Sequence, residues 1–321
     1  MAIVCNGSIA FDHIMTFRDY FKNHILPDKV HMISVSFLVD SLERRHGGCG
    51  ANISYNLALL GERPILFGAA GSDFGEYRQW LDGAGVDTSR VLVAEDKLTA
   101  SAFITTDLAD NQIIGFYPGA MERTREMSLS TVTEPIDVLL ISPNDPPAML
   151  ALAAEAQKKG HRYIFDPGQS LPAFSGDDIV DAARGAWIIV GNDYELELIR
   201  SKTGMALHDL LELATIVVCT LGENGACLIT EERDINVPAI MPEHFADPTG
   251  AGDAYRAGLV VSLLRGVDLE TAARVAGLMG TYACEGPGPQ EHSFTLDQFA
   301  ARYRKSWGSP LAAELVLAGT P

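Results

Sequence analysis

The segment ADPTGAGDAYRAG (246–258) places small residues and one carboxylate where a helix is expected to begin. Gly250, Ala251 and Gly252 lead into Asp253, and the apolar run that follows predicts a buried helix. The first amides of such a helix lack intrahelical acceptors, and glycines let a ligand approach the backbone, so this turn is suited to an anion. Asp253 would act as general base on a hydroxyl that attacks a phosphoryl group. A simple helix cap is the alternative.

A second glycine-rich segment, HGGCGANISYNLALLG (46–61), opens another predicted helix at Ala51. Gly48 permits contact between a ligand and the backbone, and the amide of Asn52 can donate and accept hydrogen bonds. Asp12 follows the first predicted strand, and ligands of open α/β sheets bind at the carboxyl ends of strands. Its carboxylate could accept two sugar hydroxyls. A tight loop and a solvated aspartate are the alternatives.

Motifs of other nucleotide-binding and metal-dependent enzymes are missing from the sequence. It contains neither a P-loop motif nor G-x-G-x-x-G, and neither H-E-x-x-H nor G-x-S-x-G. The eight histidines show no metal-binding spacing. A P-loop or Rossmann mode of nucleotide binding is therefore unsupported.

Composition limits the class of partner. The 321 residues include 24 basic and 42 acidic ones, for a net charge of -18, which would repel phosphate backbones and argues against nucleic acid as a partner. Five cysteines without a C-x-x-C pair suit a reducing compartment, so we expect a cytoplasmic protein. We expect neither a signal peptide nor a membrane partner, because the first residues carry no basic stretch and no apolar run is long enough to span a bilayer.

Short apolar runs alternate with amphipathic segments, which predicts an α/β fold with a parallel sheet. Buried strands are predicted at 2–5, 65–69, 138–141, 163–165, 187–190 and 216–219. A hairpin is predicted over 216–237. Helices are predicted at 51–60, 74–81, 147–158, 179–183, 194–201, 250–264, 269–285 and 296–306, two of them ended by Gly61 and Gly160.

Two inserted stretches, about 13–46 and 97–120, interrupt this alternation in what we interpret as a single domain over 1–321. KVHMISVSFLVD (29–40) has the pattern of an exposed strand, and 100–116 alternates like a β-ribbon. Paired together, they would form a small sheet over one edge of the domain, a candidate lid.

These residues resemble the ribokinase-like PfkB family of carbohydrate and nucleoside kinases over essentially the whole chain. The two signatures are GGCGANISYNLALLG…ILFGAAGSDFGEYRQWLDGAGVDTSRV and DPTGAGDAYRAG. GSIAFDHIMTF, SVSFLVD, FYPGAM and NDYELELIRSKTG are similar to segments of the family's bacterial adenosine kinases. The resemblance implies a three-layer α/β/α sandwich with a mainly parallel sheet and a small β-sheet lid. It also implies transfer of the γ-phosphate of ATP to the 5′-hydroxyl of adenosine with Mg²⁺. A sugar kinase of the ribokinase or fructokinase type is one alternative, and a nucleoside- or sugar-binding sensor is another.

The resemblance also assigns roles to residues. It implies that Asp253 is the catalytic base and that Gly250, Ala251 and Gly252 form the anion hole. The residues implied for the nucleoside are Ser8, Asp12, Ser36, Gly48, Asn52, Phe116 and Gln169. Those implied for ATP are Asn192, Thr220, Gly222, Gly225 and Arg256. Those implied for metals are Glu195, which would hold Mg²⁺ through water, and Asp247 and Thr249, a candidate K⁺ site.

Plain structural roles remain open for several of these residues. TLGENG (220–225) could be a hairpin corner, and Asn192 could be a helix N-cap. Arg256 could form a buried ion pair in place of a phosphate contact. Two features depart from the family pattern: the proline-rich CEGPGPQEH (284–292), and a lid aromatic shifted from position 102 to Phe103.

The lid has two further expected properties. Phe37, Phe103 and Phe116 could pack on a purine, which a bare sugar would not need. The edge of the lid sheet could pair between subunits, which predicts a homodimer through the lid.

Overall fold

The computed structural model describes residues 2–25, 34–311 and 315. Its central eight-stranded sheet contains, in spatial order, β14 (Asp234–Val237), β13 (Ala226–Ile229), β12 (Ala214–Thr220), β11 (Ala186–Asn192), β10 (Tyr163–Phe165), β9 (Val138–Ile141), β1 (Ile3–Asn6) and β4 (Ile65–Phe67). The strands from β12 to β4 are parallel to their neighbours, and β13 and β14 are added antiparallel at one edge. The predicted hairpin is therefore confirmed.

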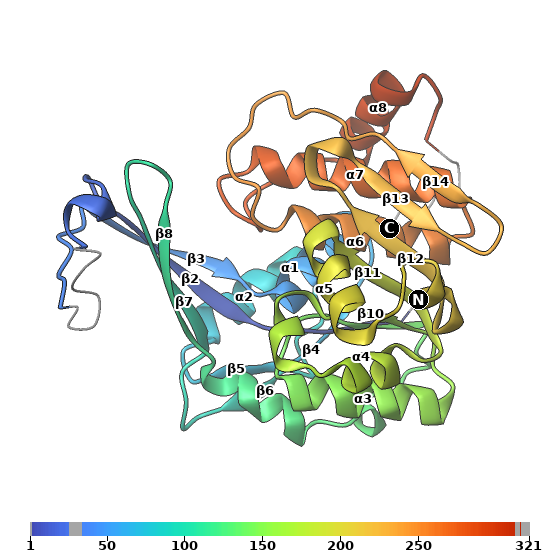
Figure 1. The fold of residues 1–321 in the computed structure, drawn as a ribbon, viewed down its shortest axis with the longest axis horizontal. Helices are drawn as coiled ribbons and strands as arrows, with labels where there is room; N and C mark the ends of the chain where they lie inside the picture. The colour runs from blue at the N-terminus through green and yellow to red at the C-terminus, as the bar shows by residue number, and fades with distance from the viewer. Residues whose placement is uncertain (1, 26–33, 312–314, 316–321) are drawn as a thin grey trace.

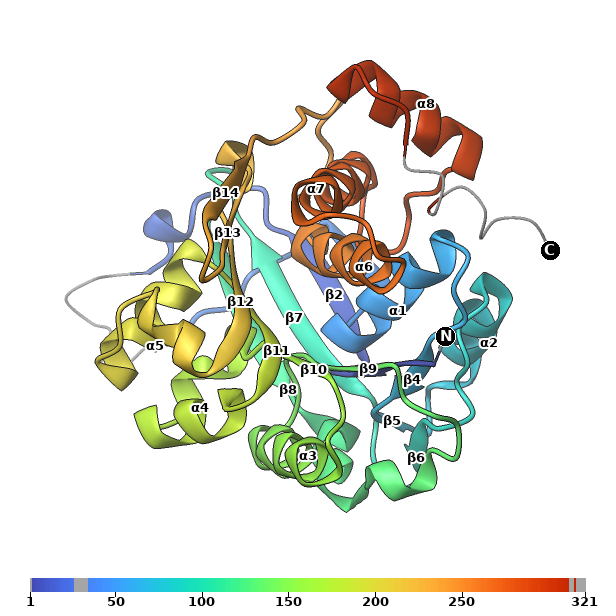
Figure 2. The ribbon, with the colours of Figure 1, turned by 90° about the vertical axis from the view of Figure 1, so that its right-hand side faces the viewer.

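Helices cover both faces of this sheet (Figures 1 and 2). One face carries α1 (Cys49–Leu59), α6 (Ala251–Leu264), α7 (Leu269–Glu285) and α8 (Leu296–Trp307), with α2 (Gly75–Ala84) beside α1. The other face carries α3 (Pro146–Lys159), α4 (Gly176–Ala183) and α5 (Asp193–Thr203). Along β1, Ile3 and Cys5 contribute to one buried cluster and Val4 to the other, because alternate side chains of a strand point to opposite faces. This confirms the predicted α/β/α sandwich.

A separate four-stranded sheet forms the lid, which extends away from the sandwich at the left of Figure 1. Its order is β3 (Ser41–Gly47), β2 (Ala10–Thr16), β7 (Ala100–Thr106) and β8 (Gln112–Tyr117). The two inserted stretches therefore do pair with each other. A third sheet contains only β5 (Ala69–Gly71) and β6 (Leu92–Ala94).

Two predicted strands were wrong in part. Residues 34–40 of the predicted strand 29–40 contain no strand, and 29–33 lie outside the described residues. These residues belong to the loop between β2 and β3, the lid loop, which is described over 17–25 and 34–40. Phe37 packs against Phe17 and Phe21 in this loop, so its apolar side chain is part of a local aromatic cluster and not of a strand face. The predicted strand 65–69 is two strands that separate at Gly68, where a Cβ would lie 2.6 Å from a carbonyl oxygen of Gly7.

The helices were predicted to within a few residues, because capping residues mark their ends. Asp145 accepts a hydrogen bond at the start of α3, and Gly160 ends that helix in the left-handed conformation. In the described part of the chain, no helix combines the length and hydropathy that a bilayer crossing requires.

Candidate active site

The first turn of α6 begins with two glycines at which an added Cβ would approach neighbouring atoms closely. Gly250 has φ of 82°, and a Cβ there would lie 2.5 Å from the Cβ of Pro289. A Cβ on Gly252 would lie 2.7 Å from Nη1 of Arg256. The turn therefore lies against a guanidinium, which is suited to an anion, and the amide of Ala251 donates a 3.1 Å hydrogen bond to the carbonyl of Pro248.

Asp253 follows this turn and is held by α1. Nδ2 of Asn52 donates a hydrogen bond of 2.9 Å to Oδ2 of Asp253, across the packed pair of helices α1 and α6. Burial raises the pKa of Asp253, whereas the positive charge of Arg256 and the bond from Asn52 oppose that rise. A carboxylate with a raised pKa and a fixed donor is typical of a general base.

Arg256 forms the buried ion pair that the sequence left open. Its Nη2 donates to Oδ1 of Asp166 at 2.8 Å, and Nε contacts Oδ2 of the same carboxylate. Burial raises the pKa of Asp166, and the guanidinium opposes that rise. The close approach to Gly252 means that the same guanidinium also lies against the anion-binding turn. Sequence reasoning missed Asp166, although its place directly after strand β10 was a signal.

The start of α1 is anchored to the end of β1. Gly48 has φ of 93°, and a Cβ there would lie 2.5 Å from the carbonyl oxygen of Ser8. The Oγ of Ser8 accepts a hydrogen bond of 3.0 Å from the amide of Cys49, and its carbonyl accepts one of 3.1 Å from the amide of Gly50. Ser8 is buried, and its hydrogen bonds tie the loop to the sheet.

Strand register shows which lid residues share a face. Asp12 pairs with Ala102, and Ala102 pairs with Phe116, so Asp12 and Phe116 lie on the same face of the lid. Phe103 lies on the opposite face, where its ring stacks on His13 at 4.7 Å. A purine held on the face of Asp12 would not reach Phe103, because a one-residue shift along a strand reverses the face. Phe37 packs on Phe17 and Phe21, and its purine contact stays a prediction.

Asp12 lies among acidic groups. Burial together with the charges of Asp247 and Asp253 raises its pKa to about 6, against the opposing charge of Arg45. Arg45 also approaches Asp247, with 3.6 Å between Nη1 and Oδ2. These contacts join the face of the lid that carries Asp12 to the loop before α6.

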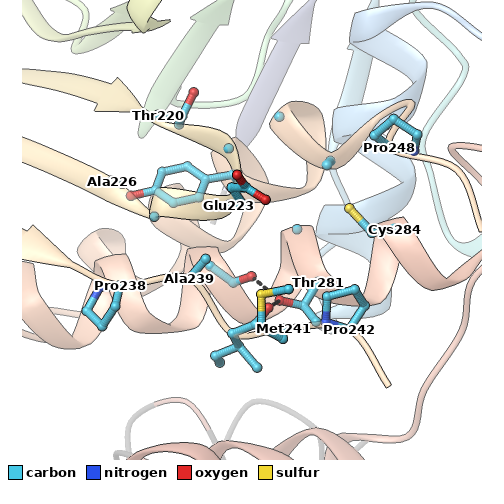
Figure 3. Close-up of a pocket in the computed structure, with 18 of the residues that line it drawn as sticks. Thr220, Glu223, Ala226, Pro238, Ala239, Met241, Pro242, Pro248, Thr281 and Cys284 are labelled. Atoms are coloured by element: carbon cyan, nitrogen blue, oxygen red, sulfur yellow. Dashed lines mark hydrogen bonds between the residues drawn. The ribbon is translucent and has the colours of Figure 1, made fainter. Parts of the chain in front are cut away.

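A pocket of about 480 Å³ opens between the hairpin β12–β13 and helices α6 and α7 (Figure 3). It is lined by five predicted residues: Thr220, Gly222, Gly225, Ala251 and Gly252. Sequence reasoning missed much of its wall, which includes Pro238, Ile240, Met241, Phe245, Tyr255, Thr281 and Cys284. Met241 and Phe245 are 68% and 66% exposed, and such apolar residues in a proline-rich loop were the available signal.

Asn192 and Glu195 form a reciprocal cap at the start of α5. The Oδ1 of Asn192 accepts a 2.8 Å bond from the amide of Glu195, and Oε2 of Glu195 accepts one of 2.8 Å from the amide of Asn192. The structural alternative for Asn192 is thus present. Its register partner on β12 is Thr220, which lines the pocket.

The remaining predicted residues are Asp247 with Thr249, Gln169 and Ser36. Asp247 accepts a 2.8 Å bond at Oδ1 from the amide of Thr249. Gln169 is exposed in the 3-10 helix Gly168–Ala173, and Ser36 is exposed in the lid loop. Among the residues that the structure describes, no three His, Cys, Asp or Glu side chains are grouped to hold a metal ion.

This fold and site define a class of phosphotransferase. The profile of the pfkB family carbohydrate kinases matches residues 9–295, and the chain belongs to that family. The resemblance found in the sequence is therefore confirmed.

Several proteins of known activity or known structure are similar to this chain. The nucleoside kinase of Methanothermobacter thermautotrophicus is 31% identical over 306 residues, which cover 94% of this chain and 95% of that protein. The solved nucleoside kinase of Burkholderia thailandensis in complex with inosine has a TM-score of 0.87 and 35% identity, covering 97% of this chain and 99% of the other. The same kinase with ADP-inosine has a TM-score of 0.85 and 37% identity, covering 97% of each chain. Adenosine kinase from Sinorhizobium meliloti shares the fold, with a TM-score of 0.74 at 21% identity over 95% of this chain and 98% of the other.

Proposed function

We propose that the protein transfers the γ-phosphoryl group of ATP to the 5′-hydroxyl of adenosine, giving AMP and ADP. The observation that carries this proposal is the place of Asp253. Its carboxylate follows a turn that lines the 480 Å³ pocket, and it is bonded to Asn52 beside the lid. A base between two binding regions is what transfer between two substrates requires.

In this proposal the residues of the α6 turn divide the work. Asp253 takes the proton from the attacking hydroxyl, while the amides of Gly250, Ala251 and Gly252 stabilise the negative charge of the transferred group. The guanidinium of Arg256 adds a positive charge against that turn. Thr220, Gly222 and Gly225 hold ATP in the pocket, with Asn192 beside them in register.

The lid supports a nucleoside over a bare sugar. Asp12, with Asn52 and Gly48, would hold the ribose hydroxyls. Ile104 and Ile114 are register partners on the same face of the lid as Asp12. They lie two residues along their strands from the pair of Ala102 and Phe116 and form an apolar strip. A purine would cover this strip, whereas ribose or fructose would leave it exposed to water. The nucleoside kinases that this chain resembles support the same choice.

We also assign Ser8, Ser36 and Gln169 to the nucleoside. Ser8 is occupied by the amide of Cys49, so its contribution would be to shape the loop. Ser36 and Gln169 are exposed and would reach the nucleoside only when the lid closes over it.

Metal ions enter the proposal through two groups of residues. The cap of α5 uses Oε2 of Glu195, so Oε1 is the oxygen that would hold a water of Mg²⁺. Bound Mg²⁺ would neutralise charge on the β- and γ-phosphates. Asp247 and Thr249 would contribute oxygens to K⁺, although one carboxylate oxygen of Asp247 already accepts the amide of Thr249.

Two further properties complete the proposal. The lid edge β8 is exposed along all six residues, which supports a homodimer formed by pairing of lids. The five cysteines are free, which is consistent with a reducing cytoplasm. Light scattering on the purified protein tests the first of these properties.

One panel of assays tests the function. The protein is incubated with ATP and Mg²⁺ and with adenosine, guanosine, inosine, ribose or fructose, and each phosphorylated product is measured. We expect adenosine to give the largest kcat/KM. Preference for ribose or fructose would favour the sugar kinase, and binding of nucleoside without product would favour the sensor.

A further inference from the structure

We infer that Gln290 is a positioning residue that fixes the orientation of the Asn52 amide and so provides Asp253 with its hydrogen-bond donor. This inference rests on the proposed function, because that function makes Asp253 the base. Gln290 lies between α7 and α8, in the proline-rich segment 284–292, and is only 1% exposed. A buried amide needs partners for both of its polar atoms.

Those partners come from two helices. The Nε2 of Gln290 donates to Oδ1 of Asn52 at 2.9 Å and to the hydroxyl of Tyr77 at 2.5 Å. Its Oε1 accepts a 3.2 Å bond from the indole Nε1 of Trp80. Because Nδ2 of Asn52 donates to Asp253, two amides in series connect α2 to the first turn of α6.

Two neighbouring groups fix the orientation of the Gln290 amide, because each can act only as donor or only as acceptor toward it. The indole N–H of Trp80 can only donate, so the atom of Gln290 that faces it must be the oxygen. The hydroxyl of Tyr77 has one proton, which it donates to the carbonyl of Gly47 at 2.8 Å, so it must accept from Gln290. A reversed Gln290 would place two donors together at Trp80 and leave Tyr77 with two acceptors for one proton.

The orientation of Asn52 follows from that of Gln290. Its Oδ1 must face the NH₂ group of Gln290, so its own NH₂ group is turned toward Asp253. A reversed Asn52 would place an amide oxygen against the carboxylate and disfavour the ionised form that a base needs. The other charged or titratable groups that act on Asp253 or are affected by it are Asp12, Cys49, Tyr77, Asp166, Glu195 and Arg256.

The test is a double-mutant cycle on two hydrogen-bonded neighbours of this series, Gln290 and Trp80. Gln290→Met keeps the length of the side chain but removes both polar atoms, and Trp80→Phe removes only the indole donor. We expect Gln290→Met to lower kcat about tenfold, which corresponds to about 1.4 kcal/mol of transition-state stabilisation, with the KM for ATP unchanged. Trp80→Phe should lower kcat about two- to threefold alone, and have no further effect in the Gln290→Met background.

Controls separate positioning from folding. Trp187→Phe is the matched control, because Trp187 lies near the start of β11 and its ring carries the guanidinium of Arg162, which has no part in this series. Thermal unfolding of each variant is measured beside the kinetics. If Gln290→Met does not fold, the kcat of Trp80→Phe tests the inference by itself. Trp80 is 43% exposed, so we expect this substitution to cost little folding stability.

The possible outcomes distinguish this inference from the proposed function. If the unmodified enzyme phosphorylates no nucleoside, the proposed function fails. If it is active, but Gln290→Met changes only the melting temperature or the KM for ATP, the inference alone is overturned. Fully additive effects of the two substitutions would overturn it as well.

Discussion

The start of α6 and the lid differ in how they hold their functional residues. At α6, Asp253 and Arg256 are fixed by side chains from α1 and from the end of β10, within the packed sandwich. On the lid, Phe116 is 50% exposed and every residue of β8 is exposed. The comparison indicates that the reacting groups lie on tightly packed elements. The surface that would contact the purine lies on the lid sheet, which is less packed.

The largest expected effect is a loss of kcat on substitution of Asp253 at the start of α6. Asp253→Asn keeps the shape of the side chain but removes the base, and we expect kcat to fall by roughly 10²–10⁴-fold. Adenosine should still bind, which isothermal calorimetry measures. Asp193→Asn, in the exposed first turn of α5, is the matched control and should change neither quantity. An unchanged kcat in Asp253→Asn would refute the assignment of the base.

An intermediate effect is expected on the KM for adenosine when a lid residue is changed. Two phenylalanines of similar exposure, Phe116 and Phe103, lie on opposite faces of the lid sheet. Phe116→Ala should raise the KM for adenosine about tenfold or more, since burial of a phenylalanine side chain contributes roughly 1.5–3 kcal/mol. Phe103→Ala is the control and should leave the KM for adenosine within about twofold. Steady-state kinetics at saturating ATP measures both. Equal effects would contradict the assignment of the two faces.

The smallest effect concerns pH and joins the two regions, because Asp12 of the lid lies near Asp247 and Asp253. Burial raises the pKa of Asp12 to about 6, so the group is ionised above that pH and becomes protonated below it. An ionised Asp12 accepts the ribose hydroxyls, so we expect the KM for adenosine to rise severalfold as pH falls from 7 to about 5. Asp12→Asn should have a high KM without this dependence. A wild-type KM that is flat across the range would count against the ribose role.

Much of the sandwich could be predicted from the sequence, because short buried runs and helix caps are local signals. The strands Val138–Ile141 and Tyr163–Phe165 and the helix Leu269–Glu285 have the predicted bounds. The glycine turns before Ala51 and Asp253 were also recognisable, since few backbone conformations other than tight turns require such residues. The lid loop around Phe37 was not, because its apolar pattern serves a cluster and not a sheet.

The sequence by itself determined the family, the layers of the fold and the residues that open α1 and α6. Only the tertiary structure decided that Asp166 pairs with Arg256, that Phe116 and not Phe103 shares a face with Asp12, and that Gln290 reaches Asn52. The physical reason is distance along the chain: Gln290 and Asn52 are separated by 238 residues, and strand register depends on partners that no local pattern encodes.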